Sequence, residues 1–319
     1  MPSPSLPNEY AVDLTPPDIA PYAAGNTGIP YIWRFEGDAP GPHAMISAIV
    51  HGNEPAGAIA LDWLMQRDFR PLRGTLTLAF MNIAAYEAFD PADPNATRWV
   101  EEDFNRVWGV DVLEGDRDSI ELRRAREVRP AVAAAGYLLD IHTMQHLAPP
   151  VMIAGTKDKG VALARDIGVP RIVIRDAGHA AGVRMRDYGA FDDAESDASA
   201  CLIECGQHWE ASAGTLAKDA TARFLVALGM ADAGLIEAAG GAEPEPQEFF
   251  EVTEAVTIKE GFTFAHAYTG GEIIQTAGTL LGHDGERAVV TPYDDCMLVM
   301  PSKRLWPGQT AVRLARRSG

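Results

Sequence analysis

The stretch AMISAIVHGNEPAGAIALDWL, residues 44–64, decides the fold. Its first seven residues, 44–50, are apolar and rich in β-branched side chains, which indicates a buried strand. Pro55 suits the first turn of a helix, and the run after it has the apolar side of a helix. His51 therefore lies at the carboxyl end of a strand, and Glu54 lies at the start of the next helix. In open α/β sheets, ligands bind in this crevice.

The same strand pattern recurs along the chain and alternates with helical segments. This alternation indicates an α/β domain, over residues 1–230, with a mainly parallel central sheet flanked by helices. Residues 231–247 have the Ala, Gly, Pro and Glu content of a linker. Residues 248–319 contain short alternating runs and a hairpin-turn signal at 283–285, which predict a smaller all-β domain. The further predicted strands are 74–83, 135–143, 151–155, 171–175 and 199–205, and the further predicted helices are 118–133 and 212–229.

Charge and composition exclude several classes of partner. The chain has 27 Lys and Arg against 45 Asp and Glu, a net charge of −18, which opposes binding to a phosphate backbone. We therefore expect no nucleic-acid partner. The proline-rich N-terminus has no basic or apolar leader region, and no apolar run reaches membrane-spanning length, so we expect a soluble cytoplasmic protein without a membrane partner. Three cysteines, Cys201, Cys205 and Cys296, are too few for a disulfide framework and are predicted to be buried thiols.

Two other predicted strands carry polar residues at their ends, where burial gives no reason for them. These are the Asp-Ile-His run that ends at His142, and Glu204. If the strands are neighbours, both residues converge with His51 and Glu54 at one edge of the sheet. Two histidines and a glutamate are a standard ligand set for a catalytic zinc with an open position. The sequence thus predicts one zinc per chain on His51, Glu54 and His142, and leaves Glu204 to accept a proton from water.

Each of these signals also has an ordinary structural interpretation. An HxxE pair occurs by chance in many proteins, and a histidine at a strand end is often a hydrogen-bonded core residue. Glu204 could cap the following helix, because carboxylates favour helix N-termini. The remaining histidines do not share the strand-end position and are predicted to be structural or solvated: His43, His146, His179, His208, His266 and His283.

Five ordered motifs resemble those of the succinylglutamate desuccinylase/aspartoacylase family, which belongs with the zinc carboxypeptidase-like hydrolases. They are HGNE (51–54), TRWVEEDFNR (97–106), LRRAREV (122–128), DIH (140–142) and IECG (203–206). The resemblance implies that His51, Glu54 and His142 bind zinc and that Glu204 is the catalytic glutamate. It implies that Arg98 helps to polarise the scissile carbonyl, and that Asn105 and Arg106 hold a substrate carboxylate. The rigid fork of an arginine suits a carboxylate, although both arginines could also be solvated charges.

The family implies hydrolysis of the amide of an N-acyl amino acid or a similar small N-acylated amine. Family members also have an arginine for the acyl carboxylate before the glutamate strand, and here Arg184, Arg186 and Tyr188 could serve. The acidic residues that follow would oppose an anionic acyl group, so an uncharged acyl group or a substrate with an additional amine fits as well. Met144 and His146 suggest a reshaped acyl pocket. The acidic residues are Asp192, Asp193, Glu195 and Asp197.

Two alternatives to a deacylase stay open at this point. One is a zinc carboxypeptidase that acts on small peptides, which would need an open groove. The other is a non-catalytic binding protein on the same fold, which fits less well because structural zinc usually has four protein ligands, often cysteines. We expect a small-molecule N-acylated partner, and a homo-oligomer is the candidate assembly.

Overall fold

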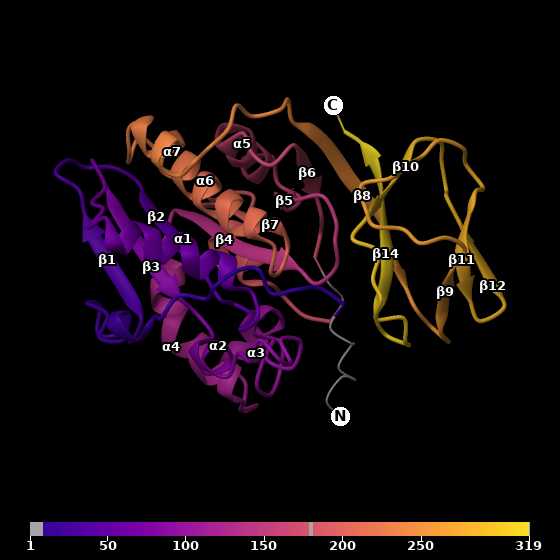
Figure 1. Cartoon of the computed structure of the whole chain (residues 1–319), viewed down its shortest axis with the longest axis horizontal. Coiled ribbons are helices and arrows are strands. Elements are labelled where there is room, and N and C mark those ends of the chain that lie inside the picture. Colours follow the sequence, from indigo (N-terminus) through magenta and orange to yellow (C-terminus); the bar gives the residue numbers. More distant parts are fainter. Residues whose placement is uncertain (1–8, 179–180, 319) are drawn as a thin grey trace.

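The computed structural model of the protein describes residues 9–178 and 181–318. A mixed eleven-stranded sheet runs through the molecule in the order β1-β3-β2-β4-β7-β5-β6-β8-β14-β13-β10, and a second sheet has the order β12-β11-β9 (Figure 1). The strands of the large sheet are β1 Ile32–Glu36, β2 His43–Ala48, β3 Thr75–Phe80, β4 Tyr137–Met144, β5 Val151–Ile153, β6 Ile172–Arg175, β7 Ser199–Gln207, β8 Glu248–Thr257, β10 Ile273–Ile274, β13 Cys296–Val299 and β14 Thr310–Arg317. The small sheet contains β9 Phe262–Phe264, β11 Leu280–Asp284 and β12 Arg287–Val290.

Helices lie between these strands along the chain. The α-helices are α1 Pro55–Gln66, α2 Ile83–Glu87, α3 Val110–Glu114, α4 Ile120–Ala134, α5 Asp158–Ile167, α6 Ala211–Ala227 and α7 Gly234–Ala238. Short 3₁₀ helices are η1 Ala20–Tyr22, η2 Phe104–Arg106, η3 Met185–Asp187 and η4 Gly189–Phe191. No helix in the described part of the chain is long and apolar enough to cross a membrane.

The centre of the large sheet is parallel. Strands β3, β2, β4 and β7 run parallel to one another, while β1 and β5 run antiparallel to their neighbours β3 and β7. Since β2, β4 and β7 are adjacent, the three strands that carry the predicted site residues are neighbours. The predicted α/β class, with a mixed central sheet and an all-β C-terminal part, is confirmed.

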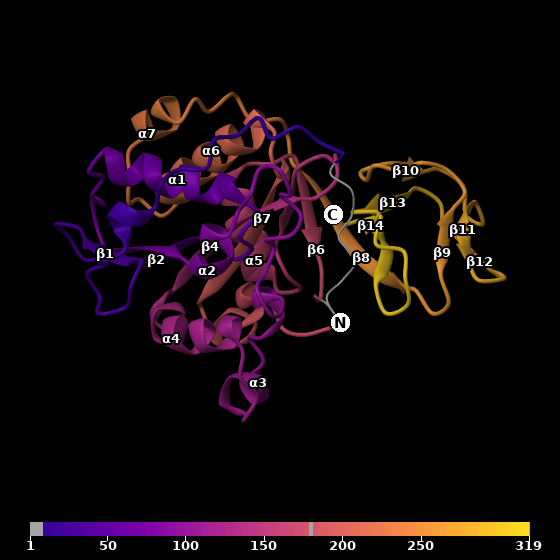
Figure 2. The ribbon, with the colours of Figure 1, turned by 60° about the horizontal axis from the view of Figure 1, so that its bottom comes forward.

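Helices cover both faces of this parallel centre (Figure 2). On one face, α1 and α6 pack on each other and on β2 and β7, and their apolar residues form one buried cluster with Ile46 and Ile203. On the other face, α4 buries Leu122, Val128 and Val132 in a second cluster. Burial on both faces explains why the central strands are almost continuously apolar.

The C-terminal strands extend the same sheet. Strand β8 pairs in parallel with β6, and β14, β13 and β10 follow in antiparallel order. The β-rich part also has a core of its own, around Phe262, Leu281 and Leu298. The predicted linker over 231–247 contains the short helix α7, and the predicted division of the chain at 230 and 248 stays a prediction. All three cysteines are buried and free, as expected.

Gly57 sets the distance between α1 and the sheet. A Cβ atom at this position would lie 2.9 Å from the Cβ of Ala48 and 3.2 Å from that of Ile141. Gly57→Ala is therefore expected to lower the free energy of unfolding by about 1–3 kcal/mol, because overpacking forces the helix away from the strands. Urea unfolding measures this change. Gly261→Ala is the control, since nothing lies within 4 Å of a Cβ there, and an equal loss in both variants would contradict the close-packing explanation.

Candidate functional site

The turn between β2 and α1 directs His51 and Glu54 into the site. Ile49, just after β2, has a φ of 53°, which is unusual for a β-branched residue. Glu54 is the residue before the first turn of α1, and Pro55 occupies that turn. The left-handed turn takes the chain out of the strand direction, so both side chains lie at the carboxyl end of β2.

His51, Glu54 and His142 form one buried cluster. The Nδ1 atom of His51 lies 2.8 Å from Oε1 of Glu54, and Nδ1 of His142 lies 3.0 Å from Oε2. One ligand atom from each residue lies within 4.8 Å of the others. Burial alone would raise the pKa of Glu54, but the two imidazoles hold it well below its usual value. The cluster thus brings a carboxylate oxygen of Glu54 and one ring nitrogen from each histidine close enough together to bind a single metal ion.

The ring nitrogen of each histidine that faces away from Glu54 meets an aspartate. Asp140 lies 3.0 Å from Nε2 of His142 and accepts a hydrogen bond of 2.7 Å from Ser47. Asp103 lies 2.9 Å from Nε2 of His51. A carboxylate on the second ring nitrogen fixes the tautomer and is typical of metal-binding histidines. The donor set and the carboxylates that support it therefore fit a zinc ion.

Glu204 lies beside His142, because the two residues are paired in the register of β4 and β7. Burial raises the pKa of its carboxyl group to about 8. Its Oε2 atom has no hydrogen-bond partner in the part of the chain that the structure describes. A carboxyl group that titrates near neutral pH and has an unused oxygen is suited to proton transfer.

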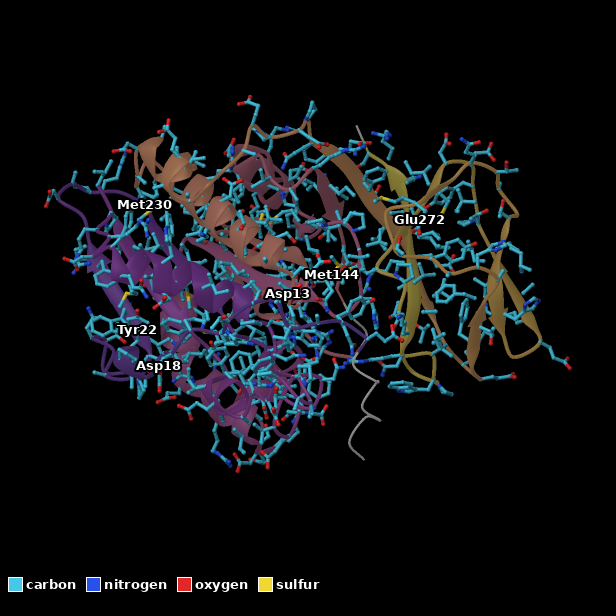
Figure 3. All side chains as sticks on the ribbon, viewed as in Figure 1. Asp13, Asp18, Tyr22, Met144, Met230 and Glu272 are labelled. Atoms are coloured by element: carbon cyan, nitrogen blue, oxygen red, sulfur yellow. The ribbon has the colours of Figure 1, made fainter. Side chains whose placement is uncertain are left out.

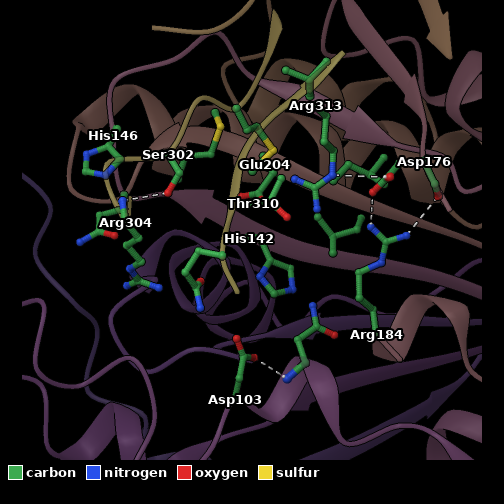
Figure 4. Close-up of a pocket in the computed structure, with 18 of the residues that line it drawn as sticks. Asp103, His142, His146, Asp176, Arg184, Glu204, Ser302, Arg304, Thr310 and Arg313 are labelled. Carbon is green, nitrogen blue, oxygen red and sulfur yellow. Dashed lines mark hydrogen bonds and ion pairs between the residues drawn. The ribbon is translucent and has the colours of Figure 1, made fainter. Parts of the chain in front are cut away.

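His51, His142 and Glu204 line a cavity of about 420 Å³ that is also lined by residues of the β-rich part. Met144, at the end of β4, lies between the two parts in Figure 3. In the close-up, Arg304 and His146 lie on one side of His142 and Glu204, and Arg184, Arg313 and Asp176 lie on the other (Figure 4). Residues from both parts of the chain therefore enclose the predicted ligands.

The structure brings Arg98, Asn105 and Arg106 to this cavity. Arg98 donates to Oε1 of Glu54 at 2.8 Å and lies 3.0 Å from Nε2 of His51. The Oδ1 atom of Asn105 accepts from the backbone N–H of Met185 at 2.8 Å, which leaves the amide N–H₂ group for other contacts.

Arg184 and Tyr188 have different positions. Arg184 lines the cavity, but it is ion-paired with Asp176 and Asp187. Tyr188 does not line it: its ring contacts Trp108 edge-on, and its hydroxyl accepts a hydrogen bond from Arg129. Tyr188 is therefore not positioned to contact a substrate in this cavity. The four acidic residues that follow it do not line the cavity either.

Two histidines that the sequence suggested were structural or solvated lie at or near the site. His146 lines the cavity, and burial lowers its pKa to about 4. His208 is buried and its Nδ1 lies 2.7 Å from the hydroxyl of Thr143, next to His142. His179 lies outside the described residues.

Sequence reasoning missed several residues of the site. Asp103 lies within the TRWVEEDFNR motif, but nothing in the sequence marks it as a partner of His51. Arg304 and Arg313 come from the C-terminal part, where no residue was proposed. A usable signal existed for Arg313, since a charged residue at a buried position of the apolar strand β14 requires a partner. Burial, followed by the charge of Arg98, lowers the pKa of Arg304 to about 10.

Comparison with known proteins agrees with this geometry. The model of the succinylglutamate desuccinylase/aspartoacylase catalytic domain matches residues 40–228. Succinylglutamate desuccinylase from Vibrio cholerae has a similar structure, with 16% identity, a TM-score of 0.65, and coverage of 90% of this chain and 86% of that chain. A succinylglutamate desuccinylase/aspartoacylase from Rhodobacter sphaeroides is 17% identical, with a TM-score of 0.62. The match covers 91% of this chain and 89% of that chain.

The product-bound structure of the ectoine utilization protein EutE (DoeB) from Ruegeria pomeroyi is similar as well. It is 16% identical, with a TM-score of 0.58, and the match covers 89% of this chain and 87% of that chain. No curated protein matches the chain. At these identities the solved structures establish the fold that the chain shares with them.

Proposed function

Because the chain belongs to the succinylglutamate desuccinylase/aspartoacylase family, we propose that it is a zinc-dependent hydrolase of the amide bond in an N-acyl amino acid or a similar small N-acylated amine. The family is one of hydrolytic deacylases. The observation that carries the proposal is the buried His51, Glu54 and His142 cluster beside Glu204, at the base of a cavity lined by arginines.

The metal would be held by one atom each of His51, Glu54 and His142. When bound, a zinc ion supplies Lewis acidity, which polarises a carbonyl group and lowers the pKa of water towards neutrality. Asp103 and Asp140 keep the two imidazoles in the orientation in which Nδ1 faces the metal position. This set leaves no fourth protein ligand among the described residues, which is typical of catalytic rather than structural zinc sites.

The proton transfers fall to Glu204. Its carboxylate accepts a proton from the attacking water and then delivers that proton to the nitrogen of the departing amine. A raised pKa assists both steps, because the group must be a base in the first and an acid in the second. Products of the proposed reaction are a carboxylate and an amine.

The arginines bind and orient the substrate. Arg98, next to Glu54, is placed to donate to the carbonyl oxygen as negative charge develops on it. Arg106 and the amide N–H₂ of Asn105 are the proposed partners of the amino-acid carboxylate, for which a guanidinium fork is well suited. A cytoplasmic location and a homo-oligomeric assembly stay predictions.

The direct test of this proposal is an assay of amine release from a panel of N-acyl amino acids by the zinc-loaded protein. Turnover of panel members, with no release of amino acids from a dipeptide panel, is the expected result. Hydrolysis of dipeptides alone would replace the proposal with the carboxypeptidase alternative. Zinc binding without hydrolysis of either panel would favour a binding protein.

Asp140 is expected to act through His142 on the metal. Asp140→Asn replaces a buried carboxylate by an amide at Nε2 of His142 and should weaken zinc binding by about 10- to 100-fold. Competition with a chromophoric chelator measures the zinc affinity. Asp166→Asn, on the exposed side of α5, serves as the control. Equal zinc affinities in the two variants would show that Asp140 does not support the site.

A further inference from the structure

The arginines that line the cavity differ in their charge partners. Arg98 is paired with Glu54, while Arg184 and Arg313 are both paired with Asp176. In residues 9–178 and 181–318, no carboxylate lies at ion-pairing distance from Arg106 or Arg304. The capacity to bind an added anion therefore lies at Arg106 and Arg304. The arginines that line this cavity are Arg98, Arg106, Arg184, Arg304 and Arg313.

Asp176 occupies the position between Arg184 and Arg313. Its Oδ2 atom accepts from Nη1 of Arg184 at 2.8 Å, and its Oδ1 atom lies 3.6 Å from Nε of Arg313. Nη2 of Arg184 also donates to the carbonyl oxygen of Asp176, and its Nε donates to Asp187. Asp176 thus provides a carboxylate partner, within the protein, for both arginines.

An apolar surface separates Asp176 from the reacting groups. Leu202 pairs with Ile153, and Ile153 pairs with Ile174, so the three side chains form a row across β7, β5 and β6. All three line the cavity. Because side chains alternate along a strand, Leu202 lies on the same face as Glu204, two residues further along β7. The row therefore leads from Glu204 towards the end of β6, just before Asp176.

We infer that Asp176 is a specificity-determining residue, which restricts this end of the cavity to an uncharged, apolar acyl group and excludes an acyl group with a carboxylate of its own. The inference rests on the proposed function, in which the amino-acid carboxylate binds at Arg106 and Asn105 and the acyl group takes the end of the cavity near Asp176. An acyl carboxylate beside Asp176 would meet a like charge at a buried site, which opposes its binding. A hydrocarbon acyl group would instead pack against Leu202, Ile153 and Ile174 and remove their apolar surface from water.

The test compares kcat/KM for N-butanoyl-L-alanine and N-succinyl-L-alanine, which have acyl chains of equal carbon number and differ in the terminal carboxylate. The zinc-loaded wild-type protein is expected to prefer the butanoyl substrate by at least about 100-fold. Asp176→Asn keeps the side-chain shape and removes the charge. It should narrow this ratio at least about tenfold, through a gain in kcat/KM with the succinyl substrate, because the acyl carboxylate no longer meets a like charge at this buried position.

Asp158→Asn is the matched control, since Asp158 pairs with Arg175 on the surface, outside the cavity. In this control, the ratio of kcat/KM for the butanoyl substrate to kcat/KM for the succinyl substrate should equal that of the wild type. Equal hydrolysis of both substrates by the wild type, or an unchanged ratio in a folded Asp176→Asn protein, would overturn the inference but leave the deacylase proposal intact. If the Asp176→Asn protein does not fold, the ratio of the two kcat/KM values in the wild type tests the inference by itself: a preference for the butanoyl substrate supports it, and equal values overturn it. Absence of hydrolysis with every N-acyl amino acid would remove the proposed function, and this inference with it.

Discussion

Glu204→Gln is expected to lower kcat by about 10²- to 10⁴-fold while zinc stays bound. The amide has the same shape as the carboxylate but cannot accept a proton from water or return one to the amine. Glu204 does not belong to the His51, Glu54 and His142 cluster, so its replacement should leave the metal in place. Steady-state kinetics and elemental analysis of the same preparation measure the two quantities together.

The control for this change is Glu237→Gln, which alters an exposed glutamate in α7. Its kcat and zinc content should match those of the wild type. A Glu204→Gln protein that retains full turnover would exclude Glu204 as the proton-transfer residue. A protein that loses zinc together with turnover would instead place Glu204 among the metal ligands.

His142→Ala is expected to lose activity by at least about 10³-fold, because metal catalysis supplies several kcal/mol of transition-state stabilisation. The change removes one of the three proposed ligand atoms and leaves Glu54 with a single imidazole partner. Chelation of the wild type should cause the same loss, and added zinc should restore the wild type but not the variant. Kinetic assays before and after zinc addition measure both effects.

His266→Ala is the matched control, because His266 is exposed in the β-rich part of the chain. It should respond to chelation and to added zinc as the wild type does. Full activity of His142→Ala after chelation would mean that the metal, if it binds, is not required for the reaction.

Much of the α/β architecture could be predicted from local patterns. The run over 44–50 became β2, and Pro55 starts α1 as expected. The polar ends of two buried strands located His142 and Glu204, because a buried polar group needs a reason that apolar packing does not give. The convergence of the site then depended only on β2, β4 and β7 being neighbours, which the sheet order confirms.

The remaining features depend on contacts between distant parts of the chain. Nothing in the β8 segment specifies that it pairs with β6, so the extension of the main sheet into the C-terminal part could not be predicted. For the same reason, the place of Arg304 and Arg313 in the cavity could not be predicted, although a charge within the apolar β14 segment indicates that Arg313 needs a partner. Tyr188 follows Arg184 closely in sequence, yet the intervening 3₁₀ turn η3 directs it into the apolar cluster beneath α4.

The most direct test of the zinc site is the metal content of the protein purified without chelators, measured by elemental mass spectrometry beside His142→Ala. We predict about one zinc per chain in the wild type, by analogy with three-ligand catalytic sites, and a loss of that zinc in the variant. A wild type without bound metal, whose activity does not appear when zinc is added, would contradict the assignment and leave residues 51–54 as an ordinary turn between a strand and a helix.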